Sequence, residues 1–271
     1  MKIFAIRDED EITRKDLAHL FYYEKDKKFY IELPDTADYW ETPLILSSFL
    51  KRGKKTVDSY WSKIWVQQRI VPTDRQNLGQ ILKANGLEEY DEFKLLMLAK
   101  GRCAQDSFYL EKVEEEKIHE LYKERMSKRI DVVIPLAGHC LLVCFKNGEV
   151  KKCDVGTLVG DNRLFRRVLN NQEIFYKVSV QTGGYGICWG EQLTISNDEL
   201  YASGENVPLE ADDLRAMIKQ QVVNSVEAAE ILGCSRQYVN ELAAKGKLTP
   251  IKSDAKTTLY LRSEVMQKSW Q

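Results

Sequence analysis

Residues 225–242 read SVEAAEILGCSRQYVNEL, a pattern of two short helices around a central glycine. Gly233 suits a tight turn between helices, because glycine adopts φ > 0 at little steric cost. Ala229 is small at a point where two helices must approach closely. Ser235 has the hydroxyl that favours the first position before a second helix. The spacing therefore predicts a helix-turn-helix unit.

The second of these helices has an apolar side and a polar beginning. Val239 and Leu242 are spaced to pack inward against Val226 and Ile231. Arginine pairs with guanine, and glutamine or asparagine pairs with adenine, at base edges in the major groove of DNA. We expect base contacts from the polar residues at the start of this helix, which are Arg236, Gln237 and Asn240.

The residues that follow predict a β-hairpin wing. Residues 250–252 and 256–261 form its two strands, and a last helix begins near 263–265. A further helix is expected at 209–222, ahead of the motif. Phosphate contacts position a protein on DNA. We assign them to residues around the recognition helix and wing, namely Ser235, Lys245, Lys247, Lys252 and Lys256.

Residues 208–271 thus resemble the winged helix-turn-helix of the excisionase and MerR-type DNA-binding families. The resemblance rests on the pattern S-x-x-E/x-A-A-x-x-L-G-x-S-x-x-x-V and covers about 50 residues. It implies a sequence-specific regulator that binds double-stranded operator DNA. Because one such module binds weakly, it also implies a homodimer.

The charge balance limits this prediction. The chain has 271 residues, with 40 Lys and Arg against 41 Asp and Glu. A net charge of −1 excludes a polybasic coating protein. Residues 222–271 contain seven basic and five acidic residues, so only this end is positive. Near-zero charge also fits the alternative function, a protein–protein adaptor or inhibitor that binds no DNA.

Residues 131–207 predict a small α+β domain. Asn147-Gly148 lies between two strand-like runs, which predicts a hairpin with a type I′ turn. A helix is expected at 162–169, and strands at 174–181 and 185–189. The opening V-x-P-L-x-x-x-x-L-x-V-x-F-x-N-G starts at Val133, and the closing residues are Gly186, Trp189, Asp198, Leu200 and Tyr201. They resemble a domain family without an assigned activity, whose members often precede helix-turn-helix domains and lie beside toxin–antitoxin genes.

Residues 111–130 contain six acidic and six basic residues, with acid ahead of base at helical spacing. This order is typical of a solvated helix and predicts a charged helical linker.

Residues 1–110 predict an α+β unit. A strand is expected at 27–33, stopped by Pro34. A helical pattern covers 40–70, with Trp61, Ile64 and Trp65 at helical spacing and the two tryptophans assigned to the core. Shorter helices are expected at 74–85 and 90–100, closed by Gly86 and Gly101.

The order of segments in this unit is similar to the amino-terminal subdomain of HipA-type toxin kinases. The matching segments are 29–31, 43–49, 69–72, Arg75, 90–96 and 101–104. The sequence departs from that family at Gln105-Asp106. No glycine-rich loop or catalytic-loop aspartate follows residue 110, so the resemblance implies a partner of a kinase and not a kinase.

Other function classes have little support in the sequence. No apolar run is long enough for a membrane span, and the short apolar start does not predict a signal peptide, so we expect a cytoplasmic protein. The six cysteines are expected to be reduced thiols. No CxxC occurs near His139, Cys140, Cys144 and Cys153, so we expect no metal and no cofactor. The only residues that could support an enzymatic activity are Cys103, His119 and His139, and we expect the chain not to be an enzyme.

The fold prediction is therefore a multidomain α+β protein. It has an N-terminal α+β unit at 1–110, a linker at 111–130, a central α+β domain at 131–207 and a winged helix-turn-helix at 208–271. The predicted function is an antitoxin-like autorepressor, whose first two units bind a protein partner such as a HipA-like kinase.

Overall fold

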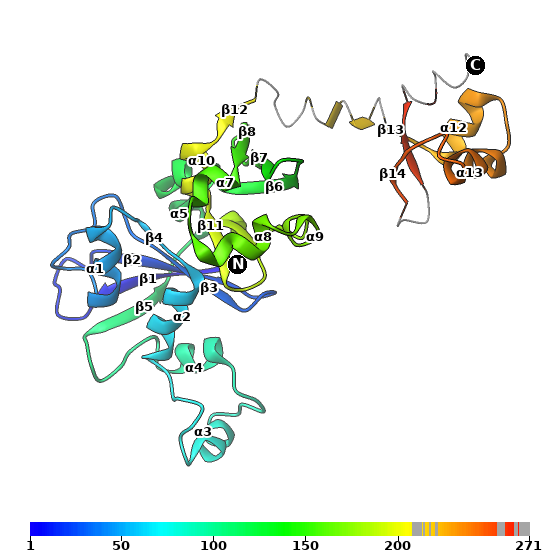
Figure 1. Cartoon of the computed structure of the whole chain (residues 1–271). Helices are drawn as coiled ribbons and strands as arrows, with labels where there is room; N and C mark the ends of the chain where they lie inside the picture. Colours follow the sequence, from blue (N-terminus) through cyan, green and yellow to red (C-terminus); the bar gives the residue numbers. More distant parts are fainter. Residues whose placement is uncertain are drawn as a thin grey trace.

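A five-stranded antiparallel sheet forms the centre of the N-terminal unit in this computed structural model (Figure 1). The structure describes residues 1–207, 213, 215–216, 218–219, 222–253, 258–262 and 265. The strand order is β4-β3-β2-β1-β5. The strands are β1 (Lys2–Asp8), β2 (Ala18–Tyr23), β3 (Lys28–Glu32), β4 (Thr56–Val57) and β5 (Phe108–Lys112).

Both faces of this sheet are buried. Successive side chains of a strand point to opposite faces. Leu20 and Ile31 lie in the larger core, whereas Phe21 and Tyr30 lie in a second cluster on the other face. The continuous apolar runs of β1 and β2 follow from this double burial, and the prediction from sequence did not identify these two strands as part of the sheet.

Helices cover the larger core. They are α1 (Leu44–Lys51), α2 (Ser59–Gln67) and α4 (Glu92–Leu98), whereas α3 (Leu78–Ala84) has no buried residue. Leu46, Trp65 and Leu96 bring α1, α2 and α4 into that core. The helical pattern expected at 40–70 is thus two helices separated by β4. Trp61 is 39% exposed, so its assignment to the core was wrong, whereas Trp65 is buried as expected.

The segment at 111–130 packs on the other face of the sheet. It forms α5 (Glu115–Leu121) and α6 (Lys123–Ser127) in place of one solvated helix. Ile118 and Tyr122 are buried against Phe21 and Tyr30, and Met126 packs beside them. These three apolar residues recur every four positions, so they form one helical stripe within a segment whose other positions are charged.

The central unit contains two small antiparallel sheets. Strands β6 (Ile130–Pro135), β7 (Cys140–Phe145), β8 (Val150–Asp154) and β12 (Glu205–Asn206) have the order β12-β8-β7-β6. The other sheet, with the order β11-β10-β9, contains β9 (Ser179–Val180), β10 (Gly186–Trp189) and β11 (Leu193–Ser196). The helical pieces are α7 (Val155–Val159), η1 (Arg163–Phe165), α8 (Arg166–Leu169), α9 (Gln172–Phe175), η2 (Thr182–Gly184) and α10 (Asn197–Ser203).

Two local predictions in the central unit need correction. The hairpin between β7 and β8 is present, but only Gly148 has positive φ, so its turn is not type I′. Gly148 N–H donates to Phe145 O at 2.9 Å, which makes a three-residue loop with glycine at the bulge position. The strand expected at 174–181 begins as α9, because the Asn171 side chain caps that helix through Ile174 N–H.

The C-terminal part forms a third core. It contains β13 (Val222–Asn224), α12 (Ser225–Leu232), α13 (Arg236–Ala244), β14 (Pro250–Lys252) and β15 (Leu259–Leu261), with the sheet order β13-β15-β14. Val239, Leu248 and Tyr260 are fully buried in it. The helix expected at 209–222 and the start of the last helix lie mostly outside the described residues.

The chain therefore mixes helices and antiparallel strands, as an α+β class requires. Within the described ranges, every helix is too short or too polar to cross a bilayer.

Candidate nucleic-acid interface

Two reciprocal hydrogen bonds fix the start of α12. The Asn224 side chain accepts from the N–H groups of Val226 and Glu227, at 2.8 and 3.1 Å. Glu227 in turn accepts from Asn224 N–H at 2.8 Å. This capping box holds the helix against β13. Gly233 ends α12 with φ +62°, which confirms the left-handed turn predicted at this glycine.

The second helix begins at a serine cap. Ser235 Oγ accepts from Tyr238 N–H at 3.2 Å, as predicted. Val239 and Leu242 are buried and face α12. The expected contact with Val226 was wrong, because that side chain is 48% exposed. Ala228 and Ala229 occupy the inward positions in its place, and their small size allows the two helices to approach.

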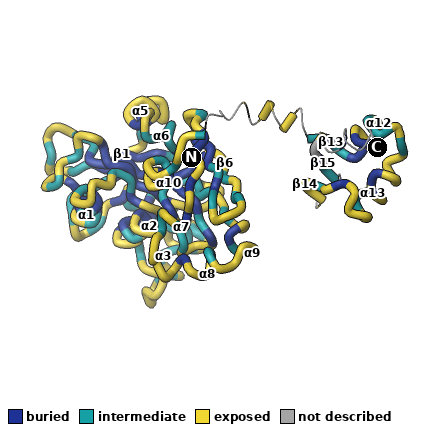
Figure 2. Tube along the Cα trace, turned by 45° about the horizontal axis from the view of Figure 1, so that its top comes forward, coloured by how far each residue is buried: buried dark blue, intermediate teal, exposed yellow. Residues whose placement is uncertain are grey.

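The three predicted base-contacting residues share the solvent side of α13. Arg236, Gln237 and Asn240 are all exposed, whereas Val239 and Leu242 on the same helix are buried. Figure 2 shows this alternation of exposed and buried segments along α13. Side chains at the first, second and fifth positions of a helix project from adjacent parts of its surface. Together they present one guanidinium and two amide groups, which are the groups that read base edges.

The predicted phosphate contacts surround this helix. Lys245 lies 3.6 Å from Glu241 in an exposed ion pair, so part of its charge is compensated within α13. Lys247 is exposed just after the helix, and Lys252 is exposed in β14. Ser235 uses its oxygen as a cap, but its hydroxyl proton can still be donated. Lys256 lies outside the described residues.

Tyr238 is a surface feature that the motif did not single out. Its side chain is 48% exposed on α13, beside Gln237. Ile251 on the wing strand β14 is likewise half exposed. A tyrosine hydroxyl can donate to a phosphate oxygen. In the sequence, Tyr238 directly follows the polar residues Arg236 and Gln237 and directly precedes the buried Val239. This placement was the signal that could have identified it.

The wing is joined to α12 through its backbone. Ser225 Oγ donates to Thr258 O at 3.2 Å, immediately before β15. Pro250 pairs with Tyr260, which is buried in the module core. Helix α13 and the β14–β15 hairpin are therefore positioned by one common core.

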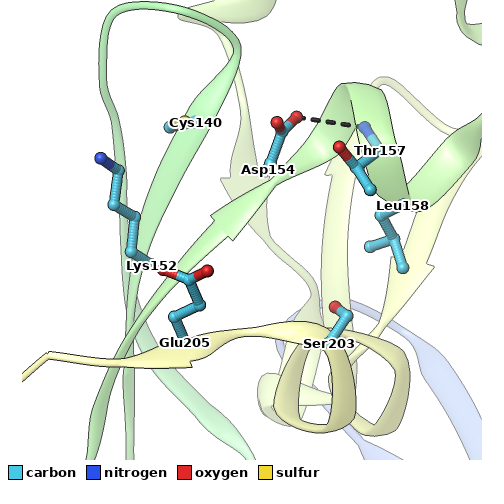
Figure 3. Close-up of a pocket in the computed structure, with 7 residues that line it drawn as sticks. All are labelled: Cys140, Lys152, Asp154, Thr157, Leu158, Ser203 and Glu205. Carbon is cyan, nitrogen blue, oxygen red and sulfur yellow. Dashed lines mark hydrogen bonds between the residues drawn. The ribbon is translucent and has the colours of Figure 1, made fainter.

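A cavity of about 520 Å³ lies elsewhere, on the central unit (Figure 3). Asp154 accepts from Thr157 N–H at 3.1 Å as the cap of α7, and this bond lowers its pKa. Lys152 and Glu205 are partners on adjacent strands β8 and β12. No histidine lines this cavity, and Cys140 Sγ is 3.6 Å from Gly138 O.

The residues considered for an enzyme have separate structural partners. Cys103 Sγ lies 3.4 Å from Asp106 Oδ1, and His119 Nε2 lies 3.2 Å from Glu115 on the same helix. The His139 ring packs edge-on against Phe175. Across the described part of the chain, no three His, Cys, Asp or Glu side chains form a metal-binding group.

Comparison with known proteins adds a family for the central unit. Residues 130–206 match the family described as "Protein of unknown function (DUF2442)". This family-matched domain coincides with the small α+β unit expected at 131–207. No curated protein matches the chain. A solved structure from Nitrosomonas europaea, described as a candidate DNA-binding protein, has 23% identity and a TM-score of 0.26. The similarity covers 45% of this chain and 79% of that one.

Proposed function

We propose that the chain is a sequence-specific DNA-binding transcriptional regulator that acts as a homodimer on operator DNA. The observation that carries this proposal is the exposed triplet of Arg236, Gln237 and Asn240 on a capped helix of a winged module. Their types and placement match the chemistry of base edges in the major groove. Dimerisation would supply the second half-site contact that such a small module needs.

The finer part of the proposal is an antitoxin-like autorepressor. In it, the N-terminal unit and the family-matched domain bind a protein partner in the cytoplasm, and a HipA-like toxin kinase is the partner we favour. The similarity of residues 1–110 to the amino-terminal subdomain of those kinases supports this choice. We assign no catalytic activity and no cofactor to the chain.

A mobility-shift assay on DNA upstream of the chain's own gene tests the DNA-binding part. Arg236→Ala should weaken binding about 10- to 100-fold and relax specificity at one base pair. Arg163→Ala removes the same charge from an exposed position in the family-matched domain and is the matched control. Equal affinity of the Arg236 variant and the unaltered protein would refute the assignment of α13 as the recognition helix.

Salt dependence separates base contacts from phosphate contacts. Lys247→Ala should weaken binding by a similar factor on all sequences and reduce the slope of log affinity against log salt by about 1. Arg236→Ala should instead change the ranking of operator variants. If neither variant alters a salt-dependent binding curve, another surface must contact DNA.

The second candidate function is a protein–protein adaptor that binds no DNA. It is favoured by the near-neutral charge of the chain, −1 overall. It predicts no salt-dependent binding to upstream DNA in the same assay. A copurified kinase would support the antitoxin proposal only if DNA binding is also present.

A further inference from the structure

A cleft of about 410 Å³ lies between the N-terminal unit and the family-matched domain. The turn after α1 and the beginning of α2 line one side, and β11 with the beginning of α10 lines the other. Figure 1 shows these elements, in blue and yellow-green, where the two units meet. Sites for small ligands commonly have volumes of this order and lie between domains.

The floor of the cleft is a rigid aromatic stack. The rings of Tyr30 and Tyr185 lie 3.9 Å apart and are nearly parallel, at 8°. Arg129 Nη2 donates to Tyr185 Oη at 2.6 Å, which holds the second ring in place. Because one ring comes from each unit, the floor exists only when the two units are packed together.

An indole forms the aromatic wall. Trp61 is 39% exposed, and its ring meets Phe49 edge-on at 6.4 Å. Asp58 caps the same helix and accepts from the backbone N–H of Trp61 at 3.0 Å, and both residues line the cleft. A cleft lined by an exposed indole and a carboxylate is a favourable place for a cation, because the ring face and the acid both attract positive charge.

The cleft carries both basic and acidic side chains, with Asp58 on the same side as the two basic residues. Arg52 and Lys54 lie on the N-terminal side, and Asp198 and Glu199 lie on the side of the family-matched domain. Lys54 Nζ is 3.9 Å from Glu199 Oε1, and both side chains are more than half exposed. Asp198 Oδ1 accepts from the Asn197 amide at 3.2 Å, and a carboxylate retains further acceptor capacity after one such bond.

We propose that this cleft binds a small zwitterion with a cationic side chain, namely arginine, free or at the carboxyl end of a peptide. The guanidinium stacks on Trp61 between Asp58 and Asp198, and the ligand carboxylate pairs with Arg52 and Lys54. A planar guanidinium suits a ring face better than the compact ammonium of lysine. The proposal goes beyond DNA binding and does not depend on it.

Calorimetric titration of the full chain tests the ligand class. L-Arginine should bind at least about tenfold more tightly than citrulline, which has the same shape without the charge, because hydrogen bonds to charged groups are the stronger ones. The tripeptide Gly-Gly-Arg distinguishes the two sources. Tighter binding of the tripeptide assigns the site to a peptide end, and binding of the amino acid alone assigns it to free arginine. Absence of binding by both, or equal binding of citrulline, overturns the proposal.

Two matched cap variants test the location. Asp58→Asn keeps a side-chain acceptor for α2, since asparagine also caps helices, but it removes the charge beside Trp61. It should weaken arginine binding about tenfold. Asp91→Asn makes the same change at the cap of α4, whose carboxylate accepts from Lys94 N–H at 2.9 Å outside the cleft, and should leave binding unchanged. Equal effects of the two variants would place arginine elsewhere and refute the proposed site.

Discussion

Arg129 Nη2 lies 3.0 Å from Glu32 Oε1, and both side chains are almost completely buried between the N-terminal sheet and the family-matched domain. Arg125 Nη1 lies at the same distance from the other carboxylate oxygen of Glu32. The three residues come from β3, α6 and the position before β6, so one carboxylate joins three parts of the chain. Removal of one partner of a buried ion pair leaves an uncompensated charge in the interior, which is strongly destabilising.

Glu32→Gln should therefore destabilise the protein by about 3–5 kcal/mol, because it leaves the Arg129 guanidinium buried without its charge partner. Calorimetry of the full chain measures the loss. Glu24→Gln removes an exposed ion pair with Lys2 and should cost about 0–1 kcal/mol. Similar effects of the two substitutions would show that the buried pair does not stabilise the junction.

Gly184 allows the closest backbone approach at this junction. Its φ is +78°, and a Cβ there would lie 2.4 Å from the carbonyl oxygen of Ile130. Gly53 has a similar φ but open space around it. Gly53→Ala should cost about 1–2 kcal/mol from backbone strain alone. Gly184→Ala should cost about 1–3 kcal/mol more from the clash, measured by the same unfolding assay. An equal cost would mean that the junction can shift to accommodate a methyl group.

Asp16 makes the stability of the N-terminal unit depend on pH. Its hydrogen bond with His19, at 3.3 Å, and that with Arg7, at 2.6 Å, lower the pKa of the Asp16 carboxyl below 3.8. A lowered pKa means stabilisation above the unfolded-state pKa of about 3.9, which is lost as pH falls through the folded-state value. Asp16→Asn should lower the melting temperature at pH 6. Between pH 6 and pH 3, the melting temperature of this variant should fall less than that of the unaltered protein. Asp161→Asn, at an exposed position, is the control. Parallel pH curves for Asp16→Asn and the unaltered protein would contradict this role.

Ser235 has two expected roles that substitution can separate. Ser235→Ala removes the cap of α13 and should destabilise the winged module by about 0.5–2 kcal/mol. Ser235→Asn restores a capping oxygen and should recover most of that stability. Amide hydrogen exchange in α13 measures the recovery. If DNA affinity returns with it, the serine acts through the cap. If affinity stays low in a stable module, the hydroxyl contacts a phosphate directly.

The features that the sequence predicted well depend on neighbours close in the chain. Gly233, Ser235 and the spacing of Val239 and Leu242 act within two helical turns, so local geometry determines them. Trp61 and Trp65 have similar local patterns, yet only Trp65 is buried, because burial depends on where the sheet lies. Arg129 and Glu32 are 97 residues apart, and their pairing has no local signal. The cleft beside them was therefore not predictable from the motif.

The boundary of the family match runs through this packed junction. Arg129 is the residue just before the matched range of 130–206, and Tyr185, which it contacts, is inside that range. A fragment cut at the family limits would expose the Tyr185 ring, because Arg129 and Tyr30, which contact it, would stay in the other piece. In this protein the limits of the family match and the limits of the packed unit therefore differ, because a cut between residues 129 and 130 divides the contact of Arg129 with Tyr185.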